Sequence, residues 1–300
     1  MTGERQTVGR ATGLIVLASC AFGSLSTLTV LIAKSGMPLL PAMFWRYLLA
    51  ALVLLVVLRK KVVCEISRRN ALKLMLVGGF GQALITYLSL HALDYLPVGP
   101  LAFLFYTYPA WVALLAAISG RENMTFIRIV ALAIAMAGIA VMVGTPTAAH
   151  LNTTGVIIAL GSAFLYALYL PSLNYVQRGI SAALSSFYLI CGVLTAFFIG
   201  NIAMGTLQMP ATTGIWEYLL LMSLFSTVIA FASLIAGLRV LGAVRTSIIA
   251  TIEPFFTALL GAVLLGESLT RLTIAGGALI AGAVVMLQWT ARDASVVPAD

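Results

Sequence analysis

Charged residues are scarce in this chain. Only 9% of its 300 residues are Asp, Glu, Lys or Arg, whereas 62% are hydrophobic. A typical soluble domain carries about 25% charged residues, so this composition excludes an ordinary soluble protein. Intrinsic disorder requires low hydrophobicity and is excluded as well. The sequence therefore predicts an all-α polytopic membrane protein.

Residues for metal, redox or nucleotide chemistry are also few. The chain has three cysteines and two histidines, without a CxxC or Cys/His cluster, which argues against a disulfide framework or a zinc site. It lacks the P-loop, HExxH and GxSxG patterns. We expect no metal, no cofactor and no catalytic residues. The net charge of +8 indicates membrane orientation and not nucleic-acid binding.

Long apolar runs, in contrast, fill the sequence. A spanning helix needs about 20 apolar residues. The runs are continuously apolar, which excludes the alternating strands of a membrane barrel. Hydropathy predicts ten transmembrane segments, at 13–33, 40–58, 71–93, 98–119, 126–144, 154–176, 182–203, 215–238, 242–265 and 271–290.

Basic residues flank these segments unevenly. Fourteen of the 17 Lys and Arg residues fall on one side of the predicted membrane, Lys34 and Arg271 fall on the other, and Arg46 lies within the second segment. Because basic residues collect in cytoplasmic loops, we expect both termini to be cytoplasmic, including a tail at 293–300. The membrane is expected to be a bacterial-type inner membrane.

The sequence contains an internal repeat. A shift of 145 residues places Pro109 on Pro254, and YPAWVALLAAISGRE on EPFFTALLGAVLLGE. This divides the chain into five-helix repeats at 1–149 and 150–292. Because five is odd, the second repeat enters the membrane from the opposite side. Inverted repeats are typical of secondary transporters, although a duplicated bundle without a transport role would show the same repeat.

Two segments also resemble a known family. The segment IEPFFTALLGAVLLGESLT at 252–270 resembles the signature of the EamA-type drug/metabolite transporter superfamily, and FWRYLLAALVLL at 44–55 looks like its second helix. FLFYTYP at 103–109, SAFLYALY at 162–169 and LSLHAL at 88–93 are most similar to YddG-type exporters of aromatic and other amino acids. The resemblance implies ten helices, small-molecule efflux, and a central cavity lined mainly by helices one, three, four, six, eight and nine.

The deepest polar residues are the candidates for substrate binding, since polar side chains in membrane segments tend to face a cavity. Glu253 is the only carboxylate deep in a segment and directly precedes Pro254. It can bind a substrate ammonium or a proton, or it can satisfy backbone groups at the kink. Pro254, Pro109 and Pro171 are candidate hinges, with static bends as the alternative.

Four tyrosines lie too deep to be interfacial anchors. We interpret Tyr106, Tyr108, Tyr166 and Tyr169 as walls of a substrate site, with helix packing as the alternative. Further substrate-binding candidates are Gln82, Tyr87, Ser24 and Asn174, and further gating candidates are Arg46 and His91. Asp94 follows His91 by three residues, a spacing that allows a His–Asp contact.

Together these features predict a transporter and not an enzyme. We expect export of small amphipathic metabolites, aromatic and other neutral amino acids above all, by alternating access around a central cavity. The expected partners are the small-molecule substrate and the lipid bilayer, and the oligomeric state stays open. The alternatives are an efflux carrier for drugs or other metabolites, an intramembrane enzyme acting on lipid-linked substrates, and a scaffold without transport activity.

Overall fold

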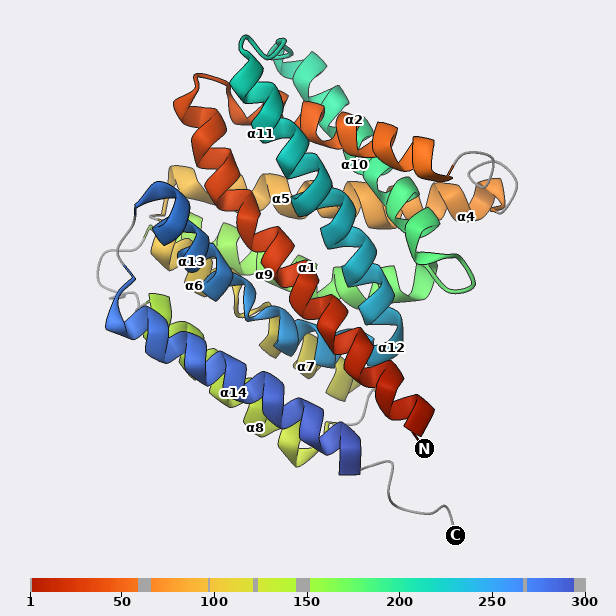
Figure 1. Ribbon diagram of the computed structural model, residues 1–300, viewed down its shortest axis with the longest axis vertical. Coiled ribbons are helices and arrows are strands. Elements are labelled where there is room, and N and C mark those ends of the chain that lie inside the picture. The colour runs from red at the N-terminus through yellow and green to blue at the C-terminus, as the bar shows by residue number, and fades with distance from the viewer. Residues whose placement is uncertain are drawn as a thin grey trace.

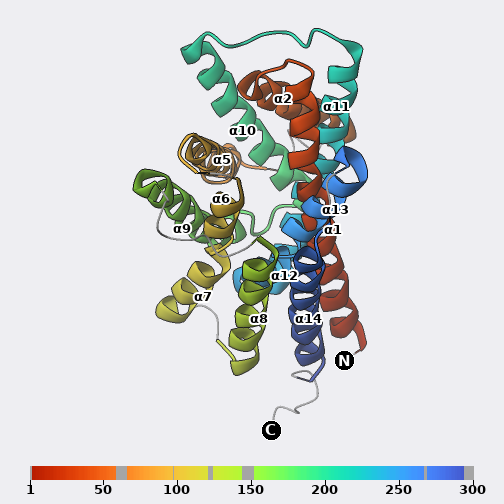
Figure 2. The same cartoon turned by 90° about the vertical axis from the view of Figure 1, so that its left-hand side faces the viewer.

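The structure is a layered bundle of helices (Figures 1 and 2). It is a computed structural model that describes residues 2–58, 66–96, 98–120, 124–143, 152–266 and 269–293. Within these ranges all regular structure is helical. The predicted boundary between the repeats, at 149/150, and the predicted tail, apart from Asp293, lie outside the described residues.

The first repeat contains straight helices and two interrupted ones. Its elements are α1 (Thr2–Lys34), α2 (Leu39–Leu58), α4 (Arg68–Lys73), the π-helix η1 (Leu74–Phe80), α5 (Gly81–His91), the 3-10 turn η2 (Ala92–Asp94), α6 (Val98–Phe105), α7 (Tyr108–Ser119) and α8 (Phe126–Val143).

The second repeat has a matching order. Its elements are α9 (Thr153–Val176), α10 (Ala182–Met204), α11 (Thr213–Ser223), the π-helix η4 (Leu224–Ile229), α12 (Ala230–Ala250), α13 (Glu253–Leu265) and α14 (Arg271–Asp293). The third predicted segment of each repeat thus contains a π-helical stretch, which is uncommon and often marks a functional site.

Seven of the described helical stretches are long and apolar enough to cross a membrane, and three shorter apolar helices accompany them, Phe126–Met142, Glu253–Leu265 and Arg271–Leu287. The helix that begins at Thr213 continues to Ala250, so the predicted segments 215–238 and 242–265 are joined. Their predicted boundary is a kink at Gly242, whose φ of 75° is readily adopted only by glycine.

Corresponding helices of the two repeats pack side by side in opposite directions. Asn201 of α10 donates a hydrogen bond to the carbonyl of Leu40 at 3.1 Å, and the rings of Phe44 and Phe198 lie 5.8 Å apart. The contacting residue number thus rises from 40 to 44 in α2 while it falls from 201 to 198 in α10, so the two helices are antiparallel.

The pair α8 and α14 follows the same rule, and both figures show these helices side by side. Gly138 lies against Gly276 and Ile280, whereas Met142 lies against Gly276, so this pair is antiparallel too. A Cβ added to Gly138 would come within 2.7 Å of the Gly276 carbonyl. Gly276 of the last helix thus permits a close helix contact inside the chain.

A third close crossing joins η1 to α10. Gly79 and Gly192 touch through their backbones, and a Cβ at position 192 would lie 2.8 Å from the Cα of Met75. Since neither backbone can move without disturbing its own helix, the crossing requires glycine on both sides. It fixes the third segment of the first repeat against the second segment of the second repeat.

This crossing yields a stability prediction. Gly192→Ala should lower the thermal unfolding midpoint of the detergent-purified protein, because overpacking a close contact costs about 1–3 kcal/mol. Gly200→Ala is the matched control in the same helix, where nothing lies within 4 Å of an added Cβ. It should be neutral or stabilising by up to about 1 kcal/mol. Equal stability of the two variants would contradict the crossing.

Candidate functional site

Two helix interruptions occupy equivalent positions in the repeats. The first separates α6 from α7 after Phe105, and the second separates α12 from α13 after Ala250, a shift of 145 residues. Pro109 and Pro254 each stand in the first turn of the helix that follows. Proline has no N–H and its ring clashes with the preceding turn, so each proline ends one helix and begins the next. Each repeat therefore has one helix interrupted directly before its proline.

The four predicted tyrosines gather beside the first interruption. Tyr108 meets Tyr166 edge to face with ring centroids 4.7 Å apart, and Tyr166 stacks on Tyr169 at 5.7 Å. Tyr106 lies 6.3 Å from Tyr108. We call these four residues the tyrosine cluster. It joins α7 and the preceding turn to α9, and sequence reasoning could not show which of the rings touch.

Phe105 belongs to the same assembly, although the sequence analysis did not single it out. Its ring lies 5.7 Å from those of both Tyr108 and Tyr166, and 5.8 Å from that of Tyr106. An apolar ring among apolar neighbours in the sequence carries no signal of such a place. In the structure it is the last residue of α6, directly before Tyr106.

Glu253 brings the second interruption to the tyrosine cluster. Its carboxyl group lies within electrostatic range of Tyr106, Tyr108 and Tyr166. The side chain is the first of α13, where a negative charge is favoured by the helix dipole. Among the described residues no basic group forms a salt bridge with Glu253.

Helix α1 packs closely behind this carboxylate. A Cβ added to Gly23 would lie 3.1 Å from the carbonyl oxygen of Glu253 and 3.1 Å from the amide nitrogen of Thr257. Ser24, the next residue, bonds to Ser226 of η4 through its hydroxyl at 2.7 Å. Helix α1 therefore contacts both the interruption at Glu253 and the π-helix η4, which belong to the second repeat.

Arg46 is the largest charged side chain that is fully buried in the described part of the chain. It is 2% exposed. Its Nε donates to the Thr227 hydroxyl and its Nη2 to the Ser226 carbonyl, both at 2.7 Å, and its guanidinium lies 4.7 Å above the ring of Tyr47. A buried cation needs such partners. Arg46 therefore connects α2 to η4, as Ser24 connects α1 to η4.

Ser226 and Thr227 are buried hydrogen-bond partners of Arg46 that sequence reasoning missed. They lie in an apolar segment as part of LFSTVI, and adjacent hydroxyls within such a run were the available signal. Ser223 completes the contact by donating to the Arg46 carbonyl at 2.8 Å. The polar groups of η4 are thus satisfied by α1 and α2 together.

Several other candidates lie apart from the tyrosine cluster. Gln82 donates to Thr86 at 3.3 Å, and the amide oxygen of Asn174 accepts from Gln177. Pro171 lies within α9, which continues to Val176 without an interruption. Among the described residues no hydrogen bond joins these three residues to the cluster.

Tyr87 and His91 form a separate group at the end of α5. Their rings stack at 5.9 Å, and Tyr87 is 45% exposed. His91 contacts Asp94 at 2.9 Å, so the His–Asp contact that the spacing allows is formed. An exposed aromatic stack at a helix end is typical of an anchor near a membrane interface.

The buried Arg46 generates a second prediction. Arg46→Lys should destabilise the protein, because a point charge cannot reproduce the two bonds of a planar guanidinium, and each bond to a charged group contributes about 1.5–3 kcal/mol. Arg46→Ala should destabilise it further. Arg178→Ala, which removes an exposed arginine, is the control. Thermal unfolding of the purified variants measures the effect, and an Arg46→Ala midpoint as high as that of the control would exclude this role.

Comparison with solved structures shows the same fold elsewhere. A crystal structure of another protein superposes with a TM-score of 0.72, covering 94% of this chain and 98% of its own, at 16% sequence identity. At this identity the similarity establishes the fold alone. No curated protein matches the sequence.

Comparison with protein families identifies both repeats. The profile of the EamA-like transporter family matches residues 10–144 and, separately, residues 153–289. The two matches nearly fill the chain, and they divide it where the sequence repeat does. The helices, the repeated interruptions and these matches lead to one conclusion: the chain belongs to the EamA-like transporter family of the drug/metabolite transporter superfamily.

Proposed function

We propose that this protein exports aromatic and other neutral amino acids across a bacterial-type inner membrane by alternating access. The observation that carries the proposal is the single carboxylate of Glu253 beside the tyrosine cluster, at the point where both interrupted helices meet. A carboxylate binds the substrate ammonium, and tyrosine rings stack on its side chain. The YddG-type exporters named from the sequence transport this class of substrate.

Ten spanning segments arranged as two inverted repeats agree with the helix order. The last turns of α12, from Ala243 on, and α13 together supply a ninth span, and α8 and α14 supply the fifth and tenth. The antiparallel pairs α2–α10 and α8–α14 support the inversion, since corresponding helices of inverted repeats run in opposite directions.

The orientation follows from charge and from the position of the chain ends. The first turns of α1 and the last turns of α14 lie at the same end of the molecule in both overall views (Figures 1 and 2). Fourteen of the 17 basic residues fall on that side of the predicted segments. We therefore assign both ends to the cytoplasm.

Paired structural elements in the two repeats could move during alternating access. Pro109 and Pro254 are hinges in the fourth and ninth segments, and the π-helices η1 and η4 interrupt the third and eighth. Arg46 gates the eighth segment by holding η4. When one repeat adopts the conformation of the other, the site at Glu253 changes the side on which it opens.

The proposal predicts a specific transport defect. In proteoliposomes without an ion gradient, Glu253→Gln should slow counterflow of labelled phenylalanine about tenfold or more, a loss of about 1.4 kcal/mol or greater. Glu217→Gln removes an exposed carboxylate of α11 and should transport like the wild type. Tyr166→Ala should also slow exchange, because it removes the ring that contacts both Tyr108 and Tyr169.

Two results would contradict the proposal. One is a failure of the folded wild-type protein to exchange any aromatic or neutral amino acid. The proposed substrate class would then change to other metabolites or drugs. The other is a Glu253→Gln variant that exchanges phenylalanine as fast as Glu217→Gln, which would remove Glu253 from the site.

A further inference from the structure

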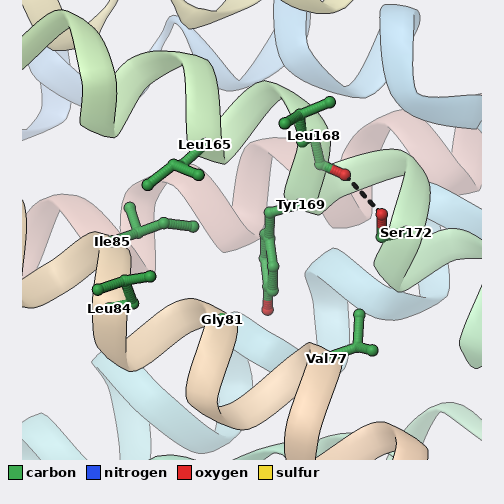
Figure 3. A pocket seen from close by; sticks show the side chains of 8 residues that line it. All are labelled: Val77, Gly81, Leu84, Ile85, Leu165, Leu168, Tyr169 and Ser172. Atoms are coloured by element: carbon green, nitrogen blue, oxygen red, sulfur yellow. Dashed lines mark hydrogen bonds between the residues drawn. The ribbon is translucent and has the colours of Figure 1, made fainter.

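An apolar groove lies on the surface between α9 and the helix formed by η1 and α5 (Figure 3). Its volume is about 250 Å³. Val77, Leu84 and Leu168 form its exposed rim, and Ile85 and Tyr169 are buried at its floor. Its two walls belong to helices that are long and apolar enough to cross a membrane. The groove therefore faces the hydrocarbon of the bilayer, where an acyl chain fits it and a polar solute does not.

The two walls of the groove run antiparallel in a fixed register. A Cβ added to Gly81 would lie 3.3 Å from Cδ2 of Tyr169, and one added to Gly78 would lie 3.5 Å from Cδ1 of Leu173. The contacts thus move toward the start of one helix as they move toward the end of the other. One more turn in this register leads to the ends of both helices that the proposed orientation places at the cytoplasmic side.

A basic side chain stands at that end of each wall. Lys73 is exposed and precedes Val77 of the rim by four residues, so the two share a helix face. Arg178 is exposed and follows the last residue of α9 by two, and its guanidinium lies 5.4 Å above the ring of Tyr175. Tyr175 is 66% exposed and follows Ser172 of the groove by three residues. The register therefore places one cation on each side of the groove mouth.

These two cations have no acidic neighbour in the walls of the groove. The helical stretches α4, η1, α5 and α9 contain neither Asp nor Glu. Among the described residues Lys73 and Arg178 form no salt bridge. Arg69, which is also exposed, adds a third positive charge one turn before Lys73. A phosphate at the mouth would therefore meet basic side chains from both walls.

We propose that the groove and its basic mouth form a binding site for an anionic phospholipid of the cytoplasmic leaflet. The phosphate lies between Lys73 and Arg178, and one acyl chain lies along the groove over the ring of Tyr169. Basic pockets between transmembrane helices at the cytoplasmic side suit such headgroups. Tyr175 then lies at the level of the headgroup, where tyrosine is favoured. The inference rests on the proposed orientation of the chain and is independent of the proposed substrate.

The bound lipid links the two repeats. One wall of the groove, from α4 to α5, belongs to the first repeat, and α9 belongs to the second. The hydroxyl of Tyr169 donates to the Gly78 carbonyl at 3.2 Å across the same boundary. A headgroup that contacts both walls, with a chain that covers this bond, strengthens the link. Because a ligand that binds only the folded chain stabilises it, the lipid should raise the unfolding temperature.

Thermal unfolding of the delipidated protein in detergent tests the headgroup contacts. Dioleoylphosphatidylglycerol should raise the midpoint of the wild type, and dioleoylphosphatidylcholine, with the same chains and no net charge, should raise it clearly less. Lys73→Gln and Arg178→Gln should each need about fivefold more phosphatidylglycerol for half of the shift, which corresponds to about 1 kcal/mol per basic residue. Arg10→Gln removes an exposed basic residue of α1 at the same membrane side and should respond like the wild type.

Further variants separate the acyl chain and the charge from the fold. Leu168→Trp fills the groove and should weaken the response to phosphatidylglycerol, whereas Ile157→Trp, at an exposed position of the same helix outside the groove, should not. Lys73→Arg and Arg178→Lys keep the charge and should keep the preference for phosphatidylglycerol. Without lipid, the variants of both basic residues should unfold at the wild-type midpoint. The two residues stand on different walls, so a folding defect in one variant leaves the other as the test.

Three results would overturn the lipid site. Equal stabilisation of the wild type by the two phospholipids would exclude headgroup recognition. Equal weakening by Arg10→Gln and Arg178→Gln would leave only a nonspecific attraction between a basic protein and an anionic lipid. Stabilisation by inorganic phosphate alone, lost in Lys73→Gln and Arg178→Gln, would assign the mouth to a free anion. Phenylalanine counterflow tests the proposed substrate separately from all three.

Discussion

The absence of water in a bilayer is the constraint on which this structure depends. A proline inside a membrane helix leaves a backbone carbonyl without its helical partner, and lipid offers nothing to replace it. This chain places Pro109 and Pro254 at equivalent positions in two helices and brings both interruptions to one place inside the bundle. Tyr106 and Glu253, whose polar groups would be costly against lipid, meet there.

The two repeats share a framework but differ in chemistry. The residue before the proline is Tyr108 in the first repeat and Glu253 in the second, so the meeting point of the repeats contains one carboxylate instead of two. The π-helices show the same relation. The Gly78 carbonyl of η1 accepts a hydrogen bond from Tyr169, whereas the Ser226 carbonyl of η4 accepts one from Arg46. Similar backbones thus have different hydrogen-bonding partners in the two repeats.

Sequence reasoning predicted what depends on composition and spacing. It predicted the helical segments, the paired interruptions and the four deep tyrosines, because apolar length, proline and repeat shift are local signals. It missed the π-helices, the Gly79–Gly192 crossing and the partners of Arg46. These depend on how each helix is rotated about its axis, and a π-helical stretch changes that rotation without a composition signal. Contacts such as that of Phe105 with Tyr166 therefore required the structure.

The central claim is that the meeting point of the two interruptions opens alternately to both sides of the membrane and holds the substrate. The most direct measurement is thiol labelling of Tyr106→Cys in a protein from which Cys20, Cys64 and Cys191 have been removed. The reagent is membrane-impermeant and is applied from each side of oriented vesicles. The account predicts labelling from both sides and protection by phenylalanine from each. Labelling from one side alone, or labelling that phenylalanine does not reduce, would contradict it.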